Sequence, residues 1–151
     1  MLKILATICI IGMATSSCTS KKASRTESSH EAEPELTMIV GTYTSGDSKG
    51  LYSFRFNEEN GTATALSEAE VENPSYLVPS ADGKFIYAVS EFSNDQAAAN
   101  AFAFNKEEGT FRLLNTQKTE GEDPCYIITN GSNVITANYS CLLYTSDAAD
   151  E

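Results

Sequence analysis

The sequence predicts an all-β fold built from a repeated four-stranded unit, and two features predict it: the length of its apolar runs and their recurrence. From Thr37 onward, runs rich in Val, Ile, Tyr, Phe and Thr alternate with clusters of Gly, Asn, Asp and Ser. Most runs have four to seven residues, which is the length of a strand rather than of a helix. The runs are MIVGTY, LYSFRF, ATAL, SYLVPS, KFIYAV, AFAF, FRLL, CYIIT and NVITANY.

The runs recur along the chain at a nearly constant spacing. NPSYLVPSADGKFIYAVSE, which starts at Asn73, aligns with DPCYIITNGSNVITANYS, which starts 50 residues later at Asp123. FNEENGTATAL from Phe56 aligns with FNKEEGTFRLL from Phe104, 48 residues later. These two matches predict a unit of four strands in about 49 residues.

A four-stranded repeat of this length is typical of a β-propeller blade. One blade cannot bury both of its faces, so blades pack face to face around an axis. Asp82-Gly83 predicts a tight hairpin turn, and Gly61 and Gly109 stand where a turn requires positive φ. We therefore expect a β-propeller with about two blades and the start of a third. The alternative is a β-sandwich with accidental internal similarity.

The N-terminus predicts export. Lys3 precedes the apolar run Ile4–Met13, which has ten residues and is too short to span a bilayer. Small residues and Cys18 follow, so residues 1–17 resemble a lipoprotein signal peptide that ends before a lipid-attached cysteine. Thr15 stands where that motif usually has Leu. The alternative is an ordinary cleaved signal in which Cys18 occurs by chance.

The rest of the chain divides into three further parts. Residues 18–36 are polar without apolar periodicity, which predicts a flexible linker, and the single histidine, His30, is expected to be solvated there. Residues 37–140 form the predicted partial propeller. Residues 141–151, CLLYTSDAADE, resemble a translated sequencing adapter, so we expect them to be non-native and to break the strand pattern. Because propellers close with about four to eight blades, the chain is expected to be the start of a longer protein.

Composition argues against two classes of partner. The formal net charge of −11 would repel nucleic acid, so none is expected. The four cysteines lack metal-ligand spacing, and only Cys125 falls within the predicted propeller, so we expect neither a metal site nor a disulfide framework. No cofactor is predicted.

Several phrases together resemble the opening of the bacterial lactonase family, seven-bladed β-propellers that include 6-phosphogluconolactonases. They are VGTYTSGDSKGLYSFRFNEENGT, ENPSYLVPSADGKFIYAVSE, GTFRLLNTQKTEGEDPCYI and VITANYS, and the resemblance covers about residues 38–140. It implies a hydrolase that opens a cyclic ester with a base-activated water and a stabilised oxyanion. The family's catalytic His, Glu and Arg come mostly from later blades. Arg55 and Arg112 fall in peripheral strand patterns, so no catalytic residue is assigned.

Three residues are candidates to line the central channel. If VGTY, YAVSE and TANY are the innermost strands, then Tyr43, Glu91 and Asn138 lie near their ends. Glu91 is either a pocket carboxylate or a hydrated loop acid. Tyr43 and Asn138 are either substrate contacts or residues that hydrogen-bond between blades.

The predicted export bears on the substrate. The chain is expected to be a lipoprotein of the cell envelope, either periplasmic or at the outer membrane, and a lipid-anchored enzyme there would rarely meet a phosphorylated lactone made in the cytoplasm. The expected substrate is therefore an unphosphorylated sugar lactone or a similar cyclic ester, and the membrane contact is the lipid anchor alone. One alternative is a non-catalytic envelope propeller that binds a glycan or a protein, since fold does not dictate function. A lactonising isomerase is a third hypothesis.

Overall fold

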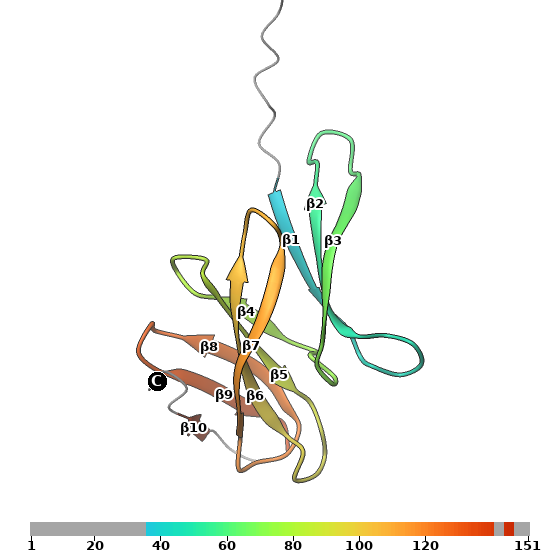
Figure 1. The fold of residues 1–151 in the computed structure, drawn as a ribbon. Helices are drawn as coiled ribbons and strands as arrows, with labels where there is room; N and C mark the ends of the chain where they lie inside the picture. Colours follow the sequence, from blue (N-terminus) through green and yellow to red (C-terminus); the bar gives the residue numbers. More distant parts are fainter. Residues whose placement is uncertain (1–35, 141–143, 147–151) are drawn as a thin grey trace, which may run out of the picture. The chain divides into compact units, whose positions relative to one another are not determined.

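The computed structural model describes residues 36–140 and 144–146, which form ten strands and no helix (Figure 1). The predicted signal peptide, Cys18, His30 and most of the residues after 140 lie outside the described part. Within that part, no helix is long and apolar enough to cross a membrane. The strands are β1 (Leu36–Gly41), β2 (Gly50–Phe56), β3 (Ala63–Glu70), β4 (Leu77–Pro79), β5 (Phe85–Ser90), β6 (Ala98–Asn105), β7 (Thr110–Lys118), β8 (Pro124–Thr129), β9 (Val134–Asn138) and β10 (Tyr144–Ser146).

The strands form three antiparallel sheets whose order follows the chain. The sheets are β1-β2-β3, β4-β5-β6-β7 and β8-β9-β10, and we number these blades 1 to 3. The predicted all-β fold with a four-stranded unit is confirmed.

Irregularities in the sheets show that β5-β6-β7 is a second copy of β1-β2-β3. The pairing of β2 with β3 shifts between Ser53 and Phe54, and the pairing of β6 with β7 shifts between Ala101 and Phe102, 48 residues later. The hairpins that follow also match, because Gly61 and Gly109 both have φ of 72°. A β-bulge at the same place in two sheets points to one repeated unit rather than to chance similarity.

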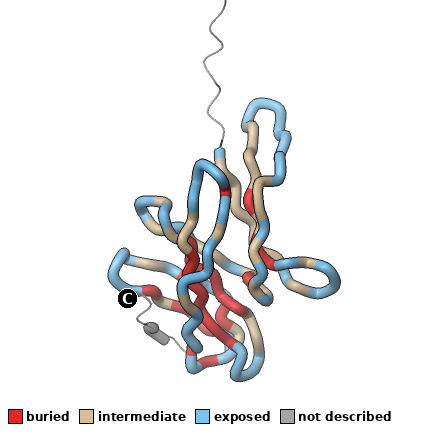
Figure 2. Tube along the Cα trace, in the orientation of Figure 1, coloured by how far each residue is buried: buried red, intermediate tan, exposed pale blue. Residues whose placement is uncertain are grey.

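Hydrophobic residues from neighbouring blades meet in two clusters (Figure 2), and β5 contributes to both because its side chains alternate between the sheet faces. Ile86 and Ala88 pack with Leu51 of blade 1, whereas Tyr87 and Val89 pack toward blade 3. Blade 2 therefore buries both of its faces against its neighbours, as the repeat predicts. The cluster between blades 1 and 2 contains Leu51, Ile86, Ala88 and Phe102; the cluster between blades 2 and 3 contains Tyr87, Val89, Ala99, Ala101, Ile127 and Val134.

The expected innermost strands are wrong for blades 2 and 3. YAVSE falls in β5, which lies between β4 and β6, and TANY falls in β9, which lies between β8 and β10. The edge positions belong to β4 and β8 instead. The runs SYLVPS and CYIIT mark these two strands, but an apolar run does not reveal the order of strands in a sheet. Among the described strands, none takes the place beside β1 that β4 takes beside β5.

Two predicted boundaries also shift. β1 begins at Leu36, one residue inside the predicted linker. Tyr144–Ser146 pair antiparallel with β9, so the strand pattern continues into the segment where it was expected to break. Whether residues 141–151 are native stays a prediction, because pairing does not reveal the origin of a segment.

Candidate functional site

The structure brings two of the three channel candidates together. Tyr43, in the loop after β1, donates a hydrogen bond from its phenol to Oε2 of Glu91, in the loop after β5, over 3.1 Å. Ser75, just before β4, donates its hydroxyl to the same carboxylate oxygen. Glu91 is half-buried and accepts from both blades 1 and 2. The sequence-predicted positions therefore form one hydrogen-bonded group at a junction between blades.

The Glu91 carboxylate changes the acidity of its partner. Its hydrogen bond, together with desolvation and its negative charge, raises the pKa of Tyr43 above the ordinary 10.0. Asp123 of the next blade adds a smaller effect of the same sign. Tyr43 therefore stays a neutral hydrogen-bond donor at neutral pH.

Asn73 links the Tyr43–Glu91–Ser75 group to blades 1 and 2 through hydrogen bonds. Its φ of 47° is the left-handed conformation that Asn tolerates better than most residues. Its side-chain oxygen accepts hydrogen bonds from the backbone nitrogen and hydroxyl of Thr44, over 3.1 and 3.0 Å. Its backbone oxygen accepts from the nitrogen of Glu91 over 3.0 Å. Asn73 thus links the loop after β1 to the end of β5.

Asp123 repeats this arrangement one blade later. It has φ of 54°, and its carboxylate accepts from Ser93 over 2.5 Å and from Ser140. Its backbone oxygen accepts from the nitrogen of Tyr139 over 2.8 Å, as that of Asn73 does from Glu91. In two successive blades, the Asn or Asp that precedes Pro therefore links neighbouring blades through hydrogen bonds.

The hydroxyl donors at Asp123 should control its titration. The hydrogen bonds from Ser140 and Ser93 hold the pKa of Asp123 below its ordinary 3.8. Because the folded-state pKa of Asp123 is depressed, its hydrogen bonds stabilise the fold fully above the unfolded-state pKa. This stabilisation is lost as pH falls through the folded-state pKa. We expect Ser140→Ala to raise the pKa of Asp123 and to flatten the loss of stability below about pH 4. Carboxyl-carbon NMR titration measures the first effect, and an unchanged pKa would contradict the assignment.

Asn138, the third candidate, does not join Tyr43 and Glu91. It lies on β9 with 8% of its surface exposed, and its amide nitrogen and oxygen are buried without a hydrogen-bond partner in the described part. Thr136, two residues earlier on β9, also buries an unpartnered hydroxyl. Whether Asn138 contacts substrate or hydrogen-bonds between blades stays a prediction.

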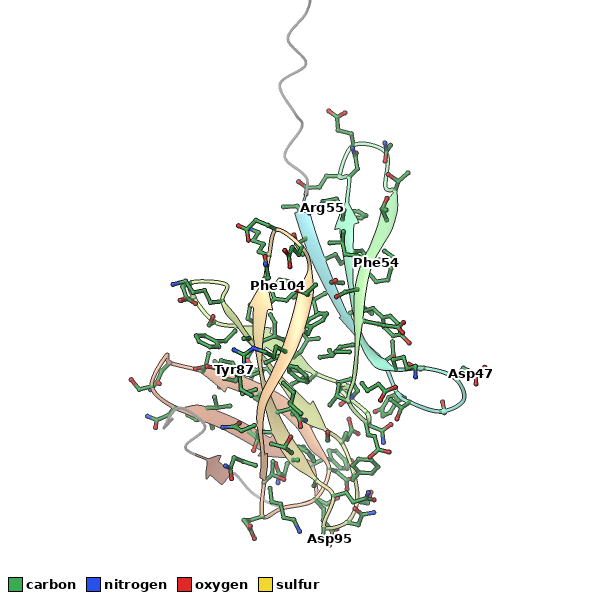
Figure 3. All side chains as sticks on the ribbon, in the orientation of Figure 1. Asp47, Phe54, Arg55, Tyr87, Asp95 and Phe104 are labelled. Carbon is green, nitrogen blue, oxygen red and sulfur yellow. The ribbon has the colours of Figure 1, made fainter. Side chains whose placement is uncertain are left out.

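The two arginines in the described part of the chain lie away from this group. The guanidinium of Arg55 on β2 donates to the backbone oxygen of Glu107, over 2.8 Å, and to the hydroxyl of Thr37, over 3.4 Å. Figure 3 shows Arg55 at the end of blade 1 opposite to Asp47, which is in the loop after β1. Arg112 lies on β7, the edge of blade 2 opposite to β4.

A pair of aromatic rings adjoins the hydrogen-bonded group and was missed as a site from sequence. The rings of Tyr76, just before β4, and Tyr126 on β8 have centroids 4.7 Å apart and planes inclined by 44°. They remain 39% and 41% exposed. Burial and the neighbouring phenol raise the pKa of Tyr76. The repeat alignment already matches these tyrosines, and that match is the signal that could have identified them.

A known protein family matches this chain over most of its length. The model of a family described as lactonase, 7-bladed beta-propeller, matches residues 37–147. The chain belongs to the lactonase family of seven-bladed β-propellers. A 6-phosphogluconolactonase of Bacillus subtilis (strain 168) is 36% identical over 106 residues, which cover 66% of this chain and 29% of that protein. The family resemblance found in the sequence is thereby confirmed.

Solved structures agree with this lactonase assignment. A candidate 6-phosphogluconolactonase from Bacteroides fragilis NCTC 9343 is 73% identical with a TM-score of 0.69, and the match covers 70% of this chain and 30% of that one. A periplasmic gluconolactonase from Pseudomonas aeruginosa is 28% identical with a TM-score of 0.65, covering 71% and 32%. The chain therefore spans about 30% of the length of these relatives.

Proposed function

We propose that the protein is a lactone hydrolase and that Glu91 is its general base. The observation that carries the assignment of the base is the half-buried carboxylate held by Tyr43 and Ser75 where two blades meet. Two donors on one oxygen fix the orientation of the carboxylate and leave the other oxygen able to accept a proton. Membership of the lactonase family and the 6-phosphogluconolactonase relatives support the reaction class.

The proposed reaction consumes one water molecule and regenerates the Glu91 carboxylate. Glu91 removes a proton from water while the water oxygen bonds to the carbonyl carbon of the lactone, which gives a tetrahedral oxyanion. The oxyanion collapses, the bond between that carbon and the ring oxygen breaks, and the departing oxygen takes the proton back from Glu91. The product is an open-chain hydroxy acid, which then releases a proton to solvent.

We further propose that the substrate is an unphosphorylated sugar lactone. A phosphate dianion is bound by Arg or Lys and repelled by carboxylates, and the charges that act on Tyr43 are the carboxylates of Glu91 and Asp123. The predicted export signal and the similarity to a periplasmic gluconolactonase support an envelope location, where such lactones are met. Anchoring through Cys18 remains part of this proposal.

The test compares two substrates on one protein. Because the chain spans about 30% of its relatives, the assay uses the product of the complete open reading frame at the source locus, here called the complete-frame protein. We expect faster hydrolysis of D-glucono-1,5-lactone than of its 6-phosphate, measured as proton release above the spontaneous rate. No hydrolysis of either lactone would contradict the function, and a strong preference for the phosphorylated lactone would contradict the proposed substrate.

A further inference from the structure

Repeat symmetry locates the Tyr76–Tyr126 pair close to the propeller axis. The two tyrosines occupy the same position in successive blades, so one rotation about the axis relates them. In a seven-bladed ring that rotation is about 51°, and a centroid separation of 4.7 Å then corresponds to about 5 Å from the axis. Equivalent residues farther out on the blades would be separated by much more, so these rings border the central channel.

The angle between the rings shows how they stand in the channel. Two rings lying flat across the axis would remain parallel after rotation, whereas two rings standing along the axis would differ by the full angle of about 51°. The observed 44° is close to the second case. About two fifths of each tyrosine is exposed, so the two rings line the side of the channel rather than close it. We call the exposed rings of Tyr76 and Tyr126 the aromatic wall.

The aromatic wall lies next to the group that holds Glu91. Tyr76 directly follows Ser75, whose hydroxyl donates to Glu91, and the backbone oxygen of Tyr76 accepts from the nitrogen of Val89 over 3.0 Å. Tyr126 lies three residues after Asp123, whose charge reaches Tyr43. The segment that carries Tyr76 therefore also holds Glu91 through Ser75, and apolar surface combined with a few fixed polar groups is typical of small-molecule sites.

We propose that Tyr76 and Tyr126 form an aromatic subsite that binds the C–H face of a pyranose lactone ring. The ring of a sugar lactone has one comparatively apolar face, and an exposed tyrosine ring offers a rigid apolar surface at a low cost in side-chain entropy. Packing against this wall holds the ring beside Glu91 while its hydroxyl groups remain free for polar contacts. This subsite rests on the proposed lactone hydrolase function, and it adds a binding role for both tyrosines.

Two substitutions of Tyr76 in the complete-frame protein test the subsite. Tyr76→Leu keeps apolar volume but removes the aromatic ring, and it should raise KM for D-glucono-1,5-lactone about tenfold while kcat changes less than threefold. Tyr76→Phe keeps the ring and should leave both constants within threefold. Tyr126→Leu should behave as Tyr76→Leu does. The thermal midpoint of each variant shows that it is folded, and a merely structural role would lower that midpoint without separating KM from kcat.

A second measurement separates this subsite from the reaction itself. D-glucono-1,5-lactam resists hydrolysis, and its binding is followed by saturation-transfer NMR on its ring protons. We expect binding to the complete-frame protein and to Tyr76→Phe but a loss of about tenfold in affinity with Tyr76→Leu. Lactam binding that depends on Tyr76 without any lactone hydrolysis would uphold the subsite and overturn the hydrolase. Lactone hydrolysis with unchanged KM and lactam affinity in Tyr76→Leu would overturn the subsite alone.

Discussion

Glu91→Gln in the complete-frame protein is expected to lower kcat for D-glucono-1,5-lactone by about 10²–10⁴-fold, the usual contribution of a positioned general base. Glutamine has nearly the same size and can still accept the hydrogen bonds from Tyr43 and Ser75 through its amide oxygen. It cannot take a proton from water. KM should change little, because the amide still fills the same space, and initial rates over a range of lactone concentrations measure both constants.

Glu72→Gln provides the matched control for this substitution. Glu72 is an exposed glutamate in the segment between β3 and β4, so this change removes the same charge while leaving the Tyr43–Glu91–Ser75 group intact. Its kcat should stay within twofold of the unsubstituted protein. If Glu91→Gln retained kcat within threefold, or if Glu72→Gln lost as much activity, Glu91 would not be the base.

The fold was predictable because the pattern that determines it is local in sequence and occurs in two copies. Strand-length apolar runs and the repeat of about 49 residues require no knowledge of distant contacts. The hairpins of Gly61 and Gly109 then confirm the repeat in detail, down to the same φ and the same bulge before them. A repeated unit that cannot bury its own faces leaves little choice of architecture.

The site was only partly predictable, because it depends on pairings between distant residues. Tyr43 and Glu91 were identified from strand ends, but their hydrogen bond joins loops 48 residues apart. The expected innermost strands were wrong in blades 2 and 3, because apolar runs such as SYLVPS and CYIIT mark a strand but do not reveal which position it takes in its sheet. No sequence pattern marked Asn73 as a residue that links two blades, because its positive φ and its hydrogen bond to Thr44 depend on the folded structure.

Gly109→Ala is expected to destabilise the complete-frame protein by about 2–5 kcal/mol, the sum of a strained left-handed alanine and an overpacked contact. Gly109 is buried against blade 1 with φ of 72°, and a Cβ there would lie 2.6 and 2.7 Å from atoms of Leu66 and 2.8 Å from the hydroxyl of Ser53. The backbone oxygen of Gly109 also accepts hydrogen bonds from Ser53 over 2.6 Å and from Ser67 over 2.5 Å. A backbone shift of residue 109 that relieves the clash would weaken these bonds between blades, and urea unfolding measures the loss.

Gly61→Ala isolates the packing contribution. Gly61 occupies the same hairpin position one blade earlier with the same φ of 72°, but nothing lies within 4 Å of its added Cβ. This variant should therefore lose only the conformational part, about 1–2 kcal/mol. The difference in unfolding free energy between the two variants measures the packing of the β6–β7 turn of blade 2 against blade 1. Equal losses of unfolding free energy would mean that the turn does not pack against blade 1. The contact of Gly109 with Leu66 and Ser53 would then be wrong.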